Sequence, residues 1–404
     1  MQEFDAIRPY SDEETAPTIR RLVNDREFLD MVGRFKKPTL AKWAPAVLRV
    51  FVRRWLLANF GHYHRIDDLQ ASLSPYIAEL VDGSTTKVTQ SGLENLSKTS
   101  AHLFISNHRD IVCDPMLCNH QLFQNGFSTT RIAIGDNLLS NRVFAEIMRL
   151  NKSFVVRRNM TSPREMRDAY LTLSGFINHC IDTNHSVWIA QREGRAKDGI
   201  DGTDPAIIKM FYMSRKKSGL AFDEAMNRLH IVPVSIAYEY DPCDVDKARE
   251  LEVRARTGEY QKSEGEDTDQ IVKGMTGFKG HVHVHFGEPI IDAPGNPKAL
   301  AARIDHEMYA NYHLHASNLA AFQMRAQQAG DNASLEQVAR HVELAEKWSD
   351  VDLETAKSEL NRRMEQCSPE CRPYLLDMYA NPVVNALAAN KDNGETLSPT
   401  PSLD

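Results

Sequence analysis

The sequence predicts an α/β fold for the central part of this chain. Short apolar and β-branched runs, typical of buried strands, alternate with helical patterns from about residue 102 to about residue 292. Turn-rich residues 83–98 precede this region, and residues 292–297, rich in Pro, Gly and Asn, follow it. The patterns after this stretch are helical. We therefore expect a central α/β domain with helical segments on both sides.

Each element of the central domain is predicted from its local pattern. Strands are expected at residues 102–106, 131–135, 154–157, 187–190, 231–238 and 281–286. Helices are expected at residues 141–150 and 163–181, and the second of these has a Pro near its start. After the central domain, helices are expected at residues 298–311, 316–329, 335–348, 352–366 and 372–389.

These patterns divide the chain into four regions. Residues 1–82 form an N-terminal helical and basic region, and residues 83–295 form the α/β domain. Residues 296–389 form a C-terminal helical region without a catalytic pattern, which we expect to brace the core or to contact another subunit. Residues 390–404 are rich in Ser, Pro, Asp and Asn and are expected to be a disordered tail. The oligomeric state is not predicted.

Composition excludes several classes of protein. The 404 residues carry a formal net charge of −7, which argues against nucleic-acid binding over a large surface. The six cysteines show no zinc-type doublets, and no signal-peptide pattern is found, so we expect reduced thiols and a cytoplasmic protein. No run of about 18 apolar residues is present, so no transmembrane helix is expected.

Residues 46–60 predict a basic amphipathic helix, in which Pro45 fits the first helical position and Gly61 is a plausible stop. Eight cations and no acid lie between Arg34 and Arg65. One face of the helix carries Val47, Leu48, Phe51, Val52 and Trp55, and the opposite face carries Arg49 and Arg53. Two roles stay open and are compatible. The helix binds an anionic membrane surface, at the inner face of the cell membrane, or it packs on the protein core.

The first polar motif, residues 107–115, follows the expected strand 102–106. It contains His108 and two carboxylates, Asp110 and Asp114. An imidazole accepts a proton near neutral pH, and a nearby carboxylate holds its tautomer and stabilises the cation that forms. The motif therefore predicts a His–Asp pair for acid/base chemistry, in which either carboxylate is a candidate partner.

Three further motifs follow in order along the chain. Residues 152–158 end in Arg157-Arg158, residues 187–195 end in Glu193-Gly194-Arg195, and residues 231–236 contain Pro233, which is expected to open or edge a strand.

These four blocks together resemble the glycerolipid acyltransferase family, which has a His-x4-Asp block, an aromatic/Arg block, a Glu-Gly-Arg-type block and a Val-Pro block. The resemblance covers about residues 85–290 and implies a mixed sheet flanked by helices. Asp114 is the favoured partner of His108, because Asp114-Pro115-Met116-Leu117 resembles the family's Asp-Pro-x-Leu. The first block then has one extra residue, and Gln191-Arg192 replaces the family's Phe-Pro.

The resemblance implies an O-acyltransferase of phospholipid biosynthesis. It would move a fatty acyl group from an acyl thioester, acyl-CoA or acyl carrier protein, to a hydroxyl of glycerol-3-phosphate or a lysophospholipid. His108 is the expected base and Asp114 orients it. The sequence has no Gly-x-Ser-x-Gly nucleophile motif, so no covalent intermediate is expected, and no cofactor is required.

The same resemblance implies which residues bind substrate. Guanidinium groups bind phosphate through paired hydrogen bonds, so the phosphate of the acceptor is expected to contact Arg157 and Arg195, with Arg158 as a further candidate. Glu193 and Gly194 are expected to shape the turn before Arg195, and Pro233 to shape the acyl-chain side of the cleft.

Two other functions stay open. The same His–Asp pair can activate water, which would make the protein an acyl-thioester hydrolase. The stretched His108-to-Asp114 spacing also fits an inactive, lipid-binding member of the family.

The stretch His281-Val282-His283-Val284-His285-Phe286 carries three alternating histidines. Because same-face side chains on one strand diverge too far to bind one ion unaided, we expect a polar strand face and no metal site.

Overall fold

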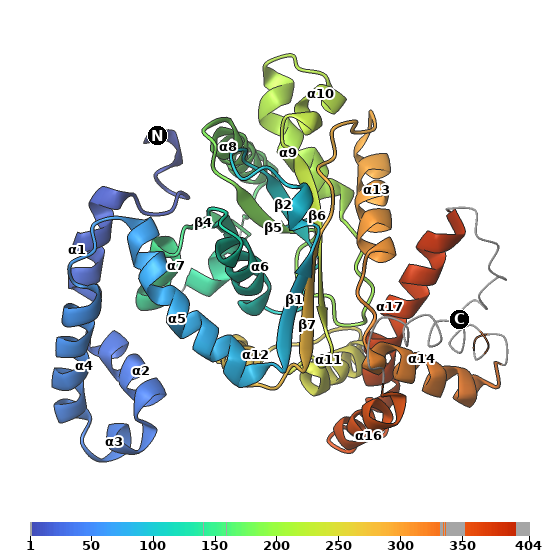
Figure 1. The fold of residues 1–404 in the computed structure, drawn as a ribbon. Helices are drawn as coiled ribbons and strands as arrows, with labels where there is room; N and C mark the ends of the chain where they lie inside the picture. Colours follow the sequence, from blue (N-terminus) through green and yellow to red (C-terminus); the bar gives the residue numbers. More distant parts are fainter. Residues whose placement is uncertain are drawn as a thin grey trace. The chain divides into compact units, whose positions relative to one another are not determined.

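The computed structural model describes residues 2–139, 141–158, 160–331, 334, 336 and 352–392 (Figure 1). Seven strands form a mixed sheet in the order β1-β7-β6-β2-β5-β3-β4. The strands are β1 (Lys87–Ser91), β2 (Leu103–Ser106), β3 (Arg131–Gly135), β4 (Ser153–Val156), β5 (Val187–Ala190), β6 (Ile231–Tyr238) and β7 (His281–Phe286). The predicted fold class, an α/β mixed sheet flanked by helices, is confirmed.

The described α-helices lie before β1, between the strands and after β7. They are α1 (Asp12–Leu22), α2 (Arg26–Lys36), α3 (Pro38–Trp43), α4 (Pro45–Phe60), α5 (Ile66–Ser84), α6 (Cys113–Gln124), α7 (Arg142–Leu150), α8 (Pro163–Asp182), α9 (Pro205–Lys217), α10 (Phe222–Asn227), α11 (Asp244–Thr257), α12 (Glu266–Thr276), α13 (Pro297–Ala310), α14 (Ala316–Ala329), α16 (Leu353–Met364) and α17 (Arg372–Asp392). The predicted helix at 335–348 and most of the predicted tail lie outside the described residues.

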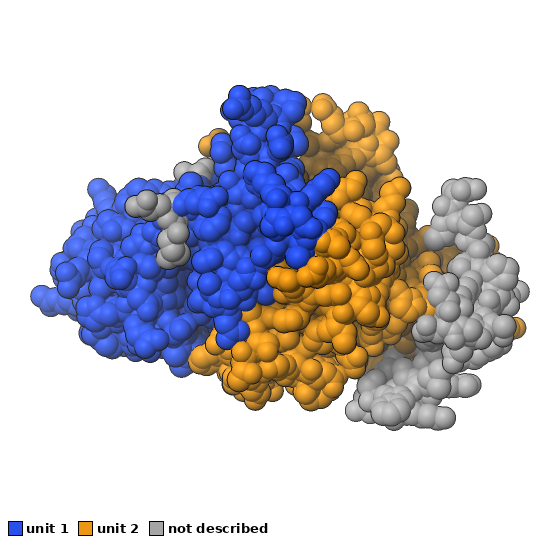
Figure 2. All heavy atoms as spheres, turned by 90° about the horizontal axis from the view of Figure 1, so that it is seen from above, with its two compact units in different colours: residues 1–78, 129–189, 210–220 blue, residues 79–128, 190–209, 221–404 orange. Residues whose placement is uncertain are grey.

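The chain divides into two compact units, which Figure 2 colours separately. Unit 1 comprises Met1–Ala78, Thr129–Ile189 and Met210–Leu220, and unit 2 comprises Glu79–Ser128, Ala190–Lys209 and Ala221–Asp404. These units interleave along the chain, so they are not the four sequence ranges proposed above, and those ranges stay a prediction.

In unit 2, the core is built on β6, whose eight residues are all buried. It pairs with β2 in parallel and with β7 antiparallel. Pro233 is the third residue of this inner strand, so the expectation that it opens or edges a strand is wrong. Its carbonyl accepts the Gly287 N–H at 2.8 Å, and residue pairing with β7 begins only at Val234. The missing N–H of Pro233 therefore lies where that pairing ends.

Strand β1 was not predicted, because the sequence analysis treated residues 83–98 as turns. Its residues, Lys-Val-Thr-Gln-Ser, are mostly polar and half-buried. It pairs in parallel with β7 at one end of the strand order (Figure 1). A strand with one neighbour buries little side chain, so it lacks the apolar pattern that marks inner strands.

The C-terminal helices α14, α16 and α17 share a hydrophobic cluster with Ala248 of α11 in unit 2 (Figure 1). Large members of this cluster are Leu319, Leu360 and Leu375, each at most 1% exposed. These helices therefore pack on the same unit that carries residues 107–115.

Candidate active site

His108 lies in the segment between β2 and α6, in unit 2. Its Nδ1 is 2.9 Å from Oδ2 of Asp114, which lies in the first turn of α6. The His108 side chain is 16% exposed and Asp114 is fully buried. The imidazole therefore reaches solvent while its carboxylate partner is enclosed.

Three other donors hold the Asp114 carboxylate. Its Oδ2 accepts the backbone N–H groups of Arg109 at 2.7 Å and Asp110 at 2.9 Å, and its Oδ1 accepts the Tyr238 hydroxyl at 2.8 Å. These donors and the helix N-terminus stabilise a negative charge. Since an ionised carboxylate only accepts, Nδ1 of His108 carries the proton and Nε2 keeps the lone pair of a base.

The hydroxyl of Tyr238 stays a donor in this arrangement. Burial, together with the charge of Asp114, holds the pKa of Tyr238 well above its usual range. Tyr238 is the last residue of β6, 124 positions from Asp114 in the chain. The sequence analysis did not single it out, although a Tyr that ends a buried strand is a candidate for a site at that strand end.

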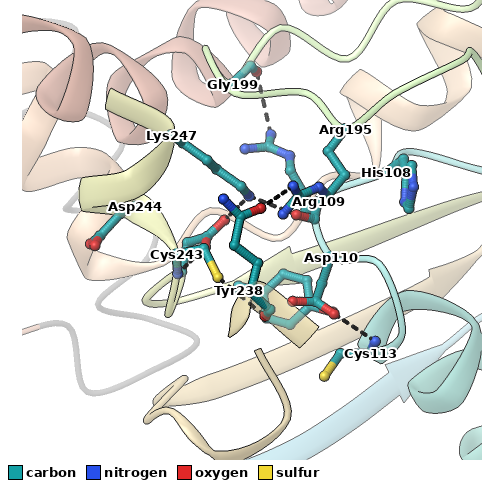
Figure 3. Close-up of polar contacts among 12 residues, drawn as sticks. His108, Arg109, Asp110, Cys113, Arg195, Gly199, Tyr238, Cys243, Asp244 and Lys247 are labelled. Atoms are coloured by element: carbon teal, nitrogen blue, oxygen red, sulfur yellow. Dashed lines mark hydrogen bonds and ion pairs between the residues drawn. The ribbon is translucent and has the colours of Figure 1, made fainter. Parts of the chain in front are cut away.

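Asp110 has a different role in the structure. Its Oδ1 accepts the backbone N–H groups of Val112 at 2.9 Å and Cys113 at 2.7 Å, where α6 begins (Figure 3). Burial and the nearby Asp114 raise its pKa. A Cβ added at Gly274 would lie 2.1 Å from Oδ2 of Asp110, so the backbone of α12 packs closely on this carboxyl. The structure thus joins Asp114 to the imidazole, whereas Asp110 accepts backbone N–H groups at the start of α6.

The loop after β5 runs beside the His108 segment. The backbone N–H of Gln191 donates to the Ser106 carbonyl at 2.8 Å, and that of Ala196 donates to the His108 carbonyl at 2.7 Å. Glu193 and Gly194 are exposed, and Gly194 has φ of 78°, which favours glycine at this turn. These bonds bring the third sequence block next to the first.

Arg195 is 8% exposed and lies among the residues of the His108 segment in Figure 3. Its Nη2 donates to Oε1 of Gln270 on α12, a residue that the sequence analysis did not single out. Its Nη1 is buried and has no hydrogen-bond partner among the residues that the structure describes. A buried guanidinium nitrogen without a partner is unusual and indicates a place for an acceptor atom.

Arg157 and Arg158 lie in unit 1, directly after β4, and both are exposed. The backbone N–H of Arg158 donates to Oδ2 of Asp136 at 3.2 Å, and its side chain donates to Oδ1 of Asn137 at 3.4 Å. Their predicted contact with the acceptor phosphate stays a prediction.

A buried ionic network holds the backbone next to His108. Arg109 donates to Oδ2 of Asp201 at 2.5 Å and to the Gly199 carbonyl at 3.3 Å. Nζ of Lys247 donates to the Arg109 carbonyl at 2.6 Å and pairs with Asp241 (Figure 3). The sequence analysis missed Lys247, because one lysine in a charged helical stretch carries no distinctive pattern.

The C-terminal helices join this network. Arg363 of α16 donates to Oδ2 of Asp244 at 2.7 Å, and the Tyr379 hydroxyl of α17 donates to the same atom at 2.8 Å. The same hydroxyl accepts the backbone N–H of Asp241 at 2.9 Å. The C-terminal helices therefore bond to the residues that position Lys247 and, through it, the Arg109 backbone.

His108 and Asp114 lie in a segment that matches a known family model. Residues 87–237 match the family model described as Acyltransferase. This match confirms, for the part of the chain that it covers, the resemblance drawn from the four sequence blocks.

Among solved structures, the chain is similar to the crystal structure of the 1-acyl-sn-glycerophosphate (LPA) acyltransferase PlsC from Thermotoga maritima. The two are 14% identical with a TM-score of 0.34, over 70% of this chain and 95% of that chain. No curated protein sequence matches the chain.

Proposed function

We propose that the chain is an O-acyltransferase of phospholipid biosynthesis that uses an acyl thioester, acyl-CoA or acyl carrier protein, as donor. The acceptor is a hydroxyl of glycerol-3-phosphate or of a lysophospholipid. The observation that carries the proposal is the His108–Asp114 pair, which lies inside the segment that matches the acyltransferase family.

His108 starts the reaction as a general base. Its Nε2 takes the proton of the acceptor hydroxyl while the oxygen attacks the thioester carbonyl carbon. The carbon–sulfur bond then breaks, and the imidazolium protonates the leaving thiolate. Asp114 stabilises the imidazolium between these steps.

A covalent acyl-enzyme at Cys113 is not part of this mechanism. Burial raises the pKa of this thiol well above its usual range, and its Sγ lies 3.3 Å from the Gly274 carbonyl, to which it donates. A buried, protonated thiol is a poor nucleophile.

The test of the proposed function is thiol release from an acyl thioester, with and without a panel of acceptor alcohols. Release that depends on the acceptor supports an acyltransferase. Release without an acceptor identifies a hydrolase, and no release on any donor and acceptor identifies an inactive scaffold.

We expect Arg195→Ala to raise KM for a phosphorylated acceptor by about tenfold to a hundredfold, because a hydrogen bond to a charged group contributes about 1.5–3 kcal/mol. KM for the acyl donor should stay nearly unchanged, since lost uniform binding of one substrate appears in its own KM. Arg157→Ala should likewise raise KM for the phosphorylated acceptor. The measurement is steady-state kinetics with each substrate varied in turn.

The control for this prediction is Arg228→Ala, which removes an exposed arginine paired with Glu224 within α10. An equal rise in KM for acceptor and donor in Arg195→Ala would show that Arg195 is structural or binds the donor.

The basic helix packs on the protein core with some of its apolar side chains and leaves others exposed. In α4, Leu48, Val52, Leu56 and Phe60 are buried in the hydrophobic cluster of unit 1. Val47 and Phe51 are 53% and 62% exposed. The predicted apolar face is therefore split, because part of it packs on neighbouring helices and part remains on the surface.

Exposed large apolar side chains are found on α2, α3 and α4. They are Met31, Phe35, Leu40, Trp43, Val47, Val50 and Phe51, and Trp43 is 84% exposed. Exposed cations on or between the same helices include Arg34, Lys37, Lys42 and Arg54. Arg49 and Arg53 instead bond to Asp30 and Asn24, at 3.0 Å and 2.9 Å.

We propose that this apolar and basic surface binds anionic lipid at the inner face of the cell membrane. Exposed aromatic side chains next to cations are typical of helices that lie in the membrane interface. Among the described residues, no helix has the length and apolar character to cross a membrane.

We expect the double variant Trp43→Ser with Phe51→Ser to weaken co-sedimentation with anionic vesicles by at least about tenfold, because each large apolar side chain contributes about 1.5–3 kcal/mol when it leaves water. Raised salt should weaken binding too, since exposed charges are screened. The matched control is Ile291→Ser, which removes a side chain that is 72% exposed elsewhere. Unchanged co-sedimentation of the double variant would show that this surface does not bind the membrane.

A further inference from the structure

We propose that His281, His313 and His315 form a binding site for a divalent transition-metal ion such as Zn²⁺. All three belong to unit 2: His281 is in β7, and His313 and His315 lie in the segment before α14. One ligand atom from each residue lies within 4.8 Å of the other two. The sequence analysis expected no site because one strand alone spreads its histidines, and the structure adds two histidines from a second segment.

The three rings are packed closely enough to enclose one ion. Their centroids are 5.0 Å apart for His281 and His313, 4.9 Å for His281 and His315, and 4.7 Å for His313 and His315. A tetrahedral zinc with bonds of about 2.0–2.1 Å separates its nitrogen ligands by about 3.3 Å. The ligand atoms, which lie within 4.8 Å of one another, must therefore approach each other by up to about 1.5 Å to bind one ion.

Hydrogen bonds to the outer nitrogens orient two of these rings. Nε2 of His315 is 3.1 Å from the Ala237 carbonyl. A carbonyl only accepts, so Nε2 carries the hydrogen and Nδ1 keeps a lone pair. Nε2 of His281 is 2.6 Å from the Thr89 hydroxyl on β1. Metal-binding histidines use their second nitrogen in this way, which fixes their tautomer.

The Thr89 hydroxyl continues into a chain of polar contacts along β1 and β7. It is 2.7 Å from Nδ1 of His283, whose Nε2 is 2.9 Å from the Ser91 hydroxyl, which in turn is 2.8 Å from Nδ1 of His285. A neutral imidazole donates through one nitrogen and accepts through the other. When His281 donates to Thr89, every member of the chain is satisfied and Nδ1 of His281 is free for a metal.

The charges near the site also suit neutral imidazole ligands. Burial lowers the pKa of His281 to about 4, and burial lowers the pKa of His313 and, to well below its usual range, that of His315. Lys87 adds positive charge near His281 and His313, and the Glu239 carboxylate accepts the backbone N–H of His281 at 2.7 Å. Burial therefore favours the uncharged form of the imidazole, which is the form that binds metal ions.

Ligand chemistry selects the class of ion. Imidazole nitrogen suits Zn²⁺, Cu²⁺, Co²⁺ and Ni²⁺, whereas Mg²⁺ and Ca²⁺ take oxygen ligands. Three imidazoles leave a fourth position of a tetrahedral ion open. A bound ion would link β7 to the segment that leads into α14.

The experiment titrates the full chain, carried without a His tag and treated with chelator, with Co²⁺ and then with Zn²⁺ in competition. We expect one ion per chain, seen as visible d–d absorption of Co²⁺ that Zn²⁺ removes. His313→Ala should weaken binding by more than 100-fold, because His313 is half-buried and its loss removes a ligand. Thr89→Val should weaken binding about 10–100-fold, as loss of an outer-shell partner does.

His64→Ala, which removes an exposed histidine in unit 1, should bind as the unaltered chain does. His108→Ala should also bind normally, which separates this site from the proposed base. The absence of stoichiometric binding, or an unchanged affinity in His313→Ala, would overturn the proposal. Thermal unfolding of each variant without metal shows whether a loss of binding reflects a loss of folding.

Discussion

His108→Ala is expected to lower kcat for acyl transfer by about 10²–10⁴-fold, the usual contribution of general acid–base catalysis. The fold should be retained, because main-chain bonds hold this segment. The His108 carbonyl accepts the Ala196 N–H at 2.7 Å, and the Arg109 N–H donates to Asp114 at 2.7 Å. Neither bond uses the imidazole, which is partly exposed.

The measurement is acceptor-dependent thiol release, with circular dichroism and thermal unfolding to check the fold. His64→Ala is the matched control, since it removes an imidazole that is exposed in unit 1. A loss of less than tenfold in a folded His108→Ala protein would mean that another group takes the proton of the acceptor.

The second large effect is expected for Asp114→Asn, which should lower kcat by about 10²–10⁴-fold. An amide places an NH₂ group where the carboxylate accepts hydrogen bonds, so at least one buried donor loses its partner. The neutral amide also no longer stabilises the imidazolium. The unpaired donor should cost about 1–3 kcal/mol of unfolding free energy.

Asp110→Asn is the matched comparison, because it changes a buried carboxylate in the same segment. Its Oδ1 accepts the N–H groups of Val112 and Cys113, and an amide oxygen can still accept them. Its kcat should stay within about tenfold. Kinetics of both variants should be measured well below their unfolding temperatures, and a larger kcat loss for Asp110→Asn would show that the wrong carboxylate has been paired with His108.

Local patterns were enough to predict much of the secondary structure. The bounds of β3, β5, β6, β7 and α14 are those expected from the sequence. Buried strands and amphipathic helices have a regular hydrophobic period in the sequence, because residues on the buried side of an element are apolar and residues on the exposed side are polar. The edge strand β1 was not predicted, since most of its side chains are only half-buried and lack an apolar pattern.

The sequence by itself was enough to identify three features: the acyltransferase-type block with His108, the loop with Arg195 and the basic N-terminal helix. It favoured Asp114 over Asp110 as the partner of His108 only through the family resemblance, because both carboxylates lie within one short segment. In the structure, Asp114 in the first turn of α6 lies against His108, while Asp110 accepts backbone N–H groups at the start of that helix.

Only the tertiary structure could bring together residues that are distant in the chain. Tyr238 meets Asp114 because β6 ends beside the start of α6, and His313 and His315 meet His281 because the segment before α14 lies against β7. Packing against neighbouring helices likewise decided which apolar side chains of α4 are buried and which are exposed. Sequence patterns report the side of an element on which a residue lies, whereas contacts between elements depend on how the chain folds back on itself.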